Sequence, residues 1–318
     1  MAYELEEAKK LVVAAGKKLV ESGLIARTWG NVSARISDTQ FVITPSGRAY
    51  ETLTPEEVVV VNIEDCSYEG DIKPSSEKGV HAAAYRHHPT VDFVIHTHQK
   101  AATIVSITGM EIRNVYKEFQ PVLGSKVPCA DYAMSTTNSL RKKVETCIMM
   151  NPGCRAIMLM HHGTLCMGDT YEQAFEIADA LEKCCQRVIK DNYLRHSWAE
   201  TYSDEGKRNF YLKKNGAVAM PESICDLGSS VRNGKTFSLT VGGETIDVDL
   251  ETGLGITGIA PKCAKIHKAI YDSQDCSIIK HVTDPDVIAV SCTGEDMIPM
   301  IDDFAQIAGV DVKNRPWI

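Results

Sequence analysis

Residues 91–106 read VDFVIHTHQKAATIVS, a largely apolar run that passes through His-Thr-His. The apolar run is typical of a buried strand, and the polar residues that follow mark the end of that strand. Successive side chains of an extended backbone alternate between its two faces, so His96 and His98 point to the same side. The sequence therefore predicts a strand whose end offers two imidazoles to one metal ion.

Strands and helices alternate around this stretch. The amphipathic segment at 4–23 and the long segment at 170–193 are typical of helices, and the segment after Ser75 and Ser76 predicts a helix that one of these serines caps. The apolar runs at 41–43, 58–63 and 154–168 are typical of strands. This alternation predicts an α/β domain over residues 1–213.

A polar, glycine-containing stretch at 212–223 is the candidate linker to a second domain, residues 214–318. Parts of this second domain resemble the first domain in sequence. SSVRNGKTFSLTVGG (229–243) resembles VSARISDTQFVITPSG (32–47), and residues 266–294 parallel residues 80–109. In this alignment His281 stands where His96 does, whereas Thr283 stands where His98 does. We expect a smaller C-terminal α/β domain that is a degenerate copy without a metal site; an unrelated small α/β domain is the alternative.

Charge and cysteine content narrow the class of protein. The chain of 318 residues has a formal net charge of −8 and no basic block, which argues against nucleic acid or an anionic membrane as its partner. Its N-terminal helix is too polar for a signal peptide or a membrane span. The 11 cysteines are scattered without a C-x-x-C pair, which favours a reducing, cytoplasmic setting.

A third histidine for the pair at 96 and 98 is offered by LMHHGTL, residues 159–165, where another apolar strand ends. Two parallel strands that end at one edge of a sheet would bring His96 and His98 together with His161 or His162. Three histidines with an open fourth position indicate a catalytic rather than a structural zinc site. Because neighbouring residues face opposite ways on an extended chain, the pattern leaves the choice between His161 and His162 open.

Three short motifs offer the small, hydroxyl or glycine residues that a phosphate monoester needs. Glu77 ends the third motif and lies in the first turn of the expected helix, where it either presents a carboxylate to a metal-bound substrate or only complements the helix dipole. The anion-binding candidates are Thr28, Gly30 and Asn31 in TWGN, Ser46 and Gly47 in TPSG, and Ser75 and Ser76 in PSSE.

The motifs T-W-G-N-V-S, I-T-P-S-G, P-S-S-E, H-T-H and H-H-G, in this order, resemble the class II aldolase and adducin family over about the first 200 residues. Within that family the chain is most similar to the sugar-1-phosphate aldolases of the L-fuculose-1-phosphate type. The resemblance implies a three-layer α/β/α domain, a zinc cofactor, a small phosphorylated sugar as substrate, and a homo-oligomer, a tetramer in the similar enzymes.

The same resemblance assigns roles to residues. It implies His96, His98 and His162 as zinc ligands, the seven anion-binding candidates as the phosphate site, and Glu77 as the acid/base. Related epimerases carry aspartate after the two serines, so Glu77 favours an aldolase. Tyr116 in RNVYKEF matches the tyrosine that acts on the aldehyde oxygen from across a subunit interface; a buried structural tyrosine is the alternative.

We therefore expect a zinc-dependent aldolase that cleaves a ketose or deoxyketose 1-phosphate to dihydroxyacetone phosphate and an aldehyde. A sugar-phosphate dehydratase of the methylthioribulose-phosphate type is the nearest alternative, and a non-catalytic adducin-like binding module is a second. The aldehyde is not fixed, because Ser135 or a neighbour stands where the fuculose enzyme has an aromatic residue.

Overall fold

The structure, a computed structural model, describes residues 2–25, 29–217, 220 and 225–301, which form two compact units. Unit 1 runs to Trp198 and includes the segment that begins at Ile298; unit 2 is Ala199–Met297. Helix α6 (Tyr171–Ser197) ends at Trp198, whose φ of 57° breaks the helix. The next helix, α7 (Asp204–Lys214), packs on α9 (Pro285–Ser291) of unit 2. The division therefore falls earlier than the boundary expected at residue 213.

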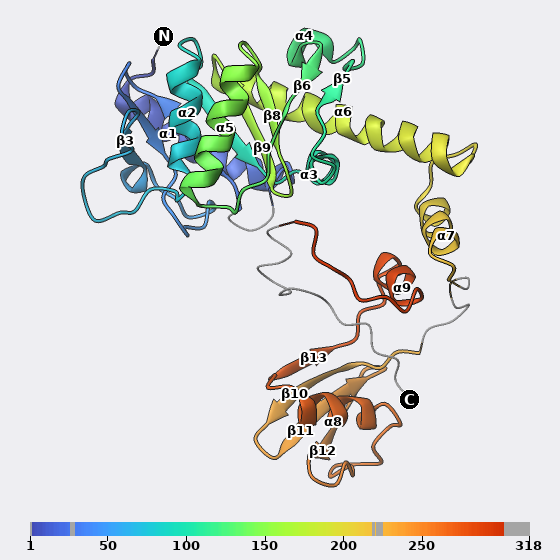
Figure 1. Ribbon diagram of the computed structural model, residues 1–318. Coiled ribbons are helices and arrows are strands. Elements are labelled where there is room, and N and C mark those ends of the chain that lie inside the picture. The colour runs from blue at the N-terminus through green and yellow to red at the C-terminus, as the bar shows by residue number, and fades with distance from the viewer. Residues whose placement is uncertain (1, 26–28, 218–219, 221–224, 302–318) are drawn as a thin grey trace. The chain divides into compact units, whose positions relative to one another are not determined.

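Unit 1 is built on a seven-stranded sheet in the order β3-β2-β1-β4-β9-β8-β7 (Figure 1). Neighbouring strands are antiparallel except for β7 and β8, which are parallel. A separate pair is formed by β5 (Ile112–Arg113) and β6 (Lys126–Val127). The main strands are β1 (Asn31–Arg35), β2 (Gln40–Ile43), β3 (Val59–Asn62), β4 (Phe93–Thr97), β7 (Cys129–Ala130), β8 (Ala156–Leu159) and β9 (Gly163–Gly168).

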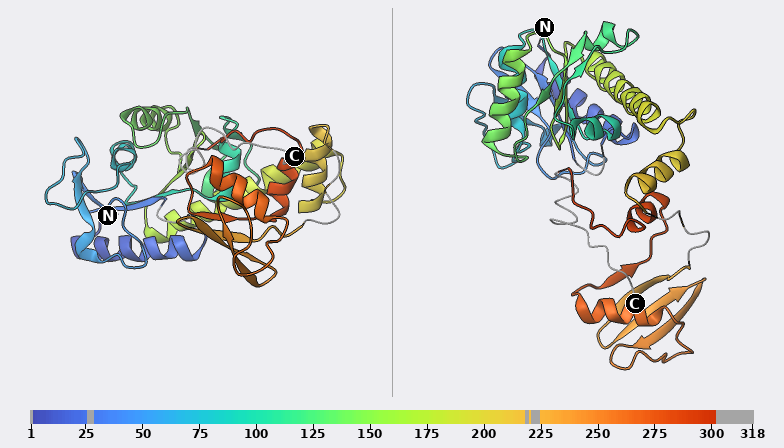
Figure 2. Two further views of the ribbon diagram at one scale, coloured as in Figure 1. Left: turned by 90° about the horizontal axis from the view of Figure 1, so that it is seen from below. Right: turned by 45° about the vertical axis from the view of Figure 1, so that its right-hand side comes forward.

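Helices cover both faces of this sheet (Figure 2). One face carries α2 (Lys78–His87) and α5 (Asn138–Met150), and the other carries α1 (Leu5–Glu21), α3 (Lys100–Ser106) and α6. Two short elements, η1 (Pro55–Glu57) and α4 (Gln120–Leu123), complete the unit. The expected three-layer α/β/α architecture is confirmed. In the described part of the chain, no helix combines the length and apolar character needed to cross a membrane.

Strand β4 lies at the centre of the sheet and is buried along its whole length. Its alternate side chains enter two different cores: Phe93 packs on the α1 side and Val94 on the α2 side. A central strand with both faces covered is expected to be mostly apolar, which explains the run at 93–95. Since β9 lies antiparallel between β4 and β8, those two strands run in the same direction and end at one edge of the sheet.

Unit 2 has a four-stranded antiparallel sheet in the order β12-β11-β10-β13. Helix α8 (Ala264–Ser273) connects β12 to β13, just as α2 lies between β3 and β4 in the chain. The register also matches, because Ser33 pairs with Val94 in unit 1 and Ser230 pairs with Ile279 in unit 2. The strands are β10 (Ser229–Asn233), β11 (Thr236–Val241), β12 (Glu244–Asp249) and β13 (Ile278–Lys280). Strand order, helix placement and register are thus the same in unit 2 and in the β1–β4 part of unit 1.

The two units differ in what covers the second face of the sheet. In unit 1, Ala34 and Phe93 on that face are fully buried by α1 and α6. At the equivalent positions of unit 2, Val231 is 46% and Ile278 is 67% exposed. The small core of unit 2 lies on the α8 side alone, and β13 ends its sheet where β4 continues to β9. Unit 2 therefore has the plan of half of unit 1.

Candidate active site

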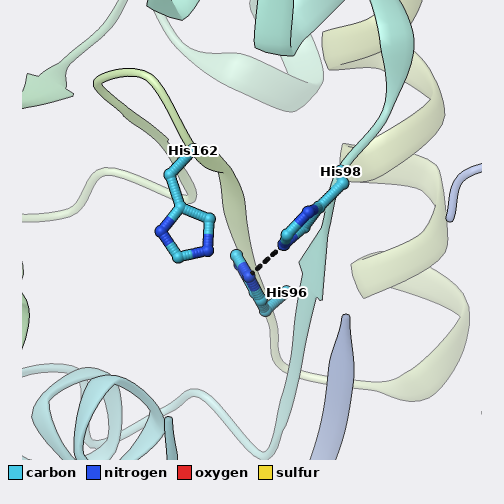
Figure 3. Close-up of side chains that lie close together, drawn as sticks. All are labelled: His96, His98 and His162. Atoms are coloured by element: carbon cyan, nitrogen blue, oxygen red, sulfur yellow. Dashed lines mark hydrogen bonds between the residues drawn. The ribbon is translucent and has the colours of Figure 1, made fainter. Parts of the chain in front are cut away.

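Three histidines converge at the edge where β4 and β8 end (Figure 3). His96 lies in β4 and His98 follows it, while His162 lies in the turn between β8 and β9. His161 has a φ of 61°, and this left-handed residue reverses the chain so that the next side chain, His162, faces the other two. The His161 ring instead contacts Tyr132, and its Nδ1 donates to the carbonyl oxygen of Met300 at 2.6 Å.

The geometry of the three imidazoles suits a metal ion. One nitrogen from each ring lies within 4.8 Å of the others, and His96, His98 and His162 form the one such group among the described residues. His96 donates from Nδ1 to the carbonyl oxygen of Thr164 at 2.9 Å, which turns its Nε2 toward the cluster. Nε2 of His98 lies only 2.8 Å from Nε2 of His96. Three imidazoles that converge in this way are a typical donor set for zinc.

Two glycines allow the chain to close around β4. A Cβ on Gly163 would lie 2.3 Å from the carbonyl oxygen of Thr97, and a Cβ on Gly30 would lie 2.8 Å from that of His96. Gly30 also has a φ of 128°, which side chains rarely tolerate. The glycines of TWGN and HHG therefore have a steric role beside the histidines.

Glu77 brings a carboxylate to the cluster. Its Oε2 lies 3.1 Å from Nε2 of His96 and its Oε1 lies 3.3 Å from Nε2 of His162, while Nδ2 of Asn31 donates to Oε2 at 3.1 Å. Burial alone raises the pKa of this carboxyl group. The attraction of His96 and His162 and the hydrogen bonds from His96 and Asn31 outweigh burial and hold the pKa well below its usual range. Glu77 is therefore a buried carboxylate.

The helix after Glu77 starts later than the sequence suggested. Helix α2 begins at Lys78 with Glu77 itself as the N-terminal capping residue, so Glu77 is not in the first turn. The Ser75 hydroxyl accepts a hydrogen bond from the backbone N–H of Glu77 at 3.2 Å. It therefore does not cap α2, and no side-chain cap forms at this end. The serine instead fixes the backbone that carries the carboxylate.

Four of the anion-binding candidates are brought together. The loops that carry TPSG and PSSE pair side by side: Ser46 donates its N–H to the Lys73 carbonyl at 2.9 Å, and Ser75 donates its N–H to the Thr44 carbonyl at 3.0 Å. Ser46, Gly47 and Ser76 are exposed and Ser75 is buried beside Glu77. The two loops form one polar surface next to the Glu77 carboxylate.

The remaining candidates of TWGN are placed differently. The Asn31 amide contacts Glu77, and the Gly30 carbonyl accepts a hydrogen bond from the Tyr50 hydroxyl at 2.5 Å. Thr28 lies outside the described residues. Asn31 therefore donates a hydrogen bond to the Glu77 carboxylate of the same chain.

Tyr116 lies apart from the histidines of its own chain. Its hydroxyl donates to Oδ2 of Asp191 at 2.8 Å, and the Arg187 guanidinium lies 4.2 Å from its ring centre. Burial and the hydrogen bond to Asp191 raise the pKa of Tyr116 to about 12. Tyr116 and Asp191 line a wide groove between α3, α5 and α6.

Sequence reasoning did not assign a role to the polar residues buried behind Glu77. His81 and Ser33 are fully buried and Tyr85 is 2% exposed. A sequence signal existed, because His81 lies four residues after Glu77, one helical turn along, and the spacing His-x-x-x-Tyr of residues 81–85 recurs at 267–271.

Comparisons with known proteins agree on one family. The model of the class II aldolase and adducin N-terminal domain matches residues 10–189. The chain is 32% identical over 183 residues to the 5-deoxy-D-ribulose 1-phosphate aldolase of Bacillus thuringiensis serovar kurstaki, covering 57% of this chain and 84% of that one. It is 33% identical over 172 residues to the L-fuculose phosphate aldolase of Escherichia coli K12, covering 54% of this chain and 78% of that one.

The fold gives the same result. A solved L-fuculose 1-phosphate aldolase superposes with a TM-score of 0.55 and 28% identity, covering 65% of this chain and 96% of the other. The shared part contains the histidine cluster and Glu77, because the family match ends at residue 189. Unit 2 lies beyond that match.

Proposed function

We propose a zinc-dependent reaction for this chain, which belongs to the class II aldolase and adducin family and is a metal-dependent aldehyde-lyase of that class. In this proposal the enzyme cleaves a ketose or deoxyketose 1-phosphate to dihydroxyacetone phosphate and an aldehyde. The observation that carries this proposal is the contact of the Glu77 carboxylate with His96 and His162, beside the paired serine loops. These contacts support a site in which the histidines bind the metal, Glu77 transfers protons and the serine loops bind the phosphate.

The residues present fit a zinc ion. His96, His98 and His162 would hold it through ring nitrogens, and three protein ligands leave the position that catalytic zinc sites keep open. When bound, zinc acts as a Lewis acid that polarises the ketone and stabilises the negative charge released by bond cleavage. Thr164 fixes the His96 ring and so holds this ligand in the required tautomer.

Proton transfer falls to the carboxylate of Glu77. In the cleavage direction the hydroxyl on the far side of the breaking carbon–carbon bond loses its proton and becomes the aldehyde. The electron pair of that bond passes to the ketone fragment, whose carbon then takes up a proton to give dihydroxyacetone phosphate. Glu77 is buried, charged and held by Asn31, so it is placed to carry that proton to and from carbon.

The phosphate of the substrate would lie against the two paired loops. Ser46, Gly47 and Ser76 are exposed there, and the buried Ser75 hydroxyl accepts a hydrogen bond from the Glu77 N–H. Hydroxyls and backbone N–H groups bind a phosphate without a lysine cluster, which fits the acidic chain. Thr28, Gly30 and Asn31 complete this site in the proposal.

A homo-oligomer is part of the proposal, because Tyr116 is tied to Asp191 in its own chain and lines a groove away from Glu77. A second copy would supply its Tyr116 to the aldehyde side. Mixing inactive Tyr116→Phe and Glu77→Gln chains should then restore part of the activity, because some sites receive both intact residues. No recovery from mixed subunits that have demonstrably exchanged would contradict a shared site.

Unit 2 is in this proposal a degenerate copy of the β1–β4 half of unit 1 that has lost the metal site. The shared strand order, helix placement and register support the copy. At the position of His96 it retains His281, but the position of His98 holds Thr283. In the described part of unit 2 no three-residue metal-binding group occurs.

The test is release of dihydroxyacetone phosphate from a panel of ketose 1-phosphates, with added zinc and with chelator. We expect zinc-dependent release that Glu77→Gln lowers by about 10²–10⁴-fold, since a general acid/base contributes roughly this much. Glu176→Gln, an exposed glutamate on α6, is the matched control and should leave release unchanged.

The other outcomes point to the alternatives. Consumption of the substrate without dihydroxyacetone phosphate, with loss of water, would replace the aldolase by a sugar-phosphate dehydratase. A purified protein that binds no zinc and consumes no member of the panel would indicate an adducin-like binding module.

A further inference from the structure

A chain of buried hydrogen bonds runs from Glu77 into the interface between α2 and the sheet. Nδ2 of Asn31 lies 3.1 Å from Glu77 Oε2, and Oδ1 of the same amide lies 2.5 Å from Nε2 of His81. Nδ1 of His81 lies 2.6 Å from the Ser33 hydroxyl, which lies 2.7 Å from the Tyr85 hydroxyl. Asn31 is 6% exposed and the residues behind it are at most 2% exposed. Bulk solvent therefore does not reach these side chains.

The chemistry of the end groups fixes the direction of every bond. The carboxylate of Glu77 only accepts, so Asn31 presents its NH₂ to Glu77 and its oxygen to His81. His81 must then donate from Nε2, which leaves Nδ1 to accept from the Ser33 hydroxyl. The Ser33 oxygen accepts in turn from Tyr85. All four donors point toward Glu77, and such aligned bonds strengthen one another.

His81 acts in this chain as a neutral group. Complete burial lowers its pKa to about 3, with a smaller contribution from the nearby His96. A neutral imidazole has one donor and one acceptor, and both are used here. The opposite tautomer would present a lone pair to Asn31 and would favour the flipped amide, with its oxygen against the carboxylate.

Unit 2 contains the same serine–histidine–tyrosine hydrogen bonds, but no carboxylate among its described residues is joined to them. The Ser230 hydroxyl lies 2.8 Å from Nδ1 of His267 and 2.9 Å from the Tyr271 hydroxyl. Nε2 of His267 donates to the carbonyl oxygen of Leu227 at 2.7 Å. By the strand register, Gly228 stands where unit 1 has Asn31. The serine, histidine and tyrosine therefore join helix to sheet in both units, and only Asn31 links them to a site.

We infer that His81 is a positioning residue, which fixes the Asn31 amide so that its NH₂ group holds the Glu77 carboxylate between His96 and His162. This inference rests on the proposed function, because it concerns the residue assigned there as the acid/base. It also makes a prediction about the His81 ring that is independent of any substrate.

The first measurement is the tautomer of His81, from ¹⁵N chemical shifts of the imidazole in the full-length protein, with the His81→Gln spectrum to assign the signal. We expect a neutral ring with the proton on Nε2 and none on Nδ1. A proton on Nδ1, or a doubly protonated ring at neutral pH, would overturn the inference. This result is obtained even if no sugar phosphate is cleaved, so it separates failure of the inference from failure of the proposed function.

The second measurement is a double-mutant cycle on cleavage. His81→Leu removes the donor, and we expect kcat to fall by about 10–100-fold, as for other residues that orient a site. KM and zinc content should change little. In an Asn31→Ala background the same substitution should have no further effect on kcat, because its route to Glu77 is already gone.

Two further variants separate positioning from general damage to the fold. His81→Gln keeps an N–H donor and should recover part of kcat. His267→Leu makes the same change in unit 2 and should leave kcat unchanged. Equal falls in kcat on His81→Leu with and without Asn31, or no fall at all, would contradict the inference.

Discussion

Gly163 decides, as a single residue, how closely the turn that carries His162 approaches β4. A Cβ at this position would lie 2.3 Å from the Thr97 carbonyl oxygen, which is backbone and cannot move aside as a side chain does. Gly163→Ala should therefore lower the free energy of unfolding by about 1–3 kcal/mol, the usual cost of overpacking. It should also weaken zinc binding, because His162 would shift from His96 and His98. Denaturant unfolding and a zinc titration measure the two effects.

Gly258→Ala is the control for this substitution. A Cβ at position 258 would meet no atom of the described residues closer than 3.8 Å, so the free energy of unfolding of this variant should change little. If Gly163→Ala bound zinc with unchanged affinity, the close approach of the turn would not position His162.

At the scale of elements, α6 holds the start of α3, which follows directly on His98. The Glu182 carboxylate on α6 accepts from the backbone N–H of Ala101 at 2.8 Å and of Ala102 at 3.1 Å. These N–H groups lie in the first turn of α3, where no intrahelical partner exists. Glu182→Ala should destabilise unit 1 by about 1–2 kcal/mol and lower zinc affinity, because the segment that carries His98 loses its anchor. Thermal unfolding and zinc titration test this.

The matched control is Asp179→Ala on the same helix. Asp179 forms an exposed pair with Lys183 at 2.6 Å, with both side chains about 60% exposed, so the change should cost at most about 1 kcal/mol. Equal effects of the two substitutions would mean that the contact of Glu182 with α3 has no special importance.

At the scale of the whole molecule, the chain has separate cores in its two units. Unit 2 has its own apolar cluster, which includes Phe237, Val248 and Tyr271, and the histidine cluster belongs to unit 1 alone. Calorimetry should therefore resolve two transitions. Removal of zinc should lower the midpoint of one by on the order of 10 °C, since a tightly bound ligand stabilises only the unit that binds it.

The assignment of the transitions is checked with Phe237→Ala, a core residue of unit 2 that is fully buried. It should lower the midpoint of the transition that is insensitive to zinc. A single transition that responds to both changes would mean that the units unfold together.

The fold class and the family could be predicted from the amino-acid sequence alone. Periodicity is local, so the apolar run before His96, the long helix α6 and the pair His96 and His98 could be predicted from the sequence. The proposed repeat rests on the same kind of pattern, because similar strand and helix motifs recur at 229–294.

The tertiary structure decided what depends on contacts between distant segments. Alternation could not choose between His161 and His162, because the choice depends on a left-handed residue in a turn. The start of α2 and the division after Trp198 depend on which hydrogen bonds and helix contacts form, so both differed from expectation. The link from His81 through Asn31 to Glu77 joins residues 50 and 46 positions apart, and only packing α2 against β1 creates it.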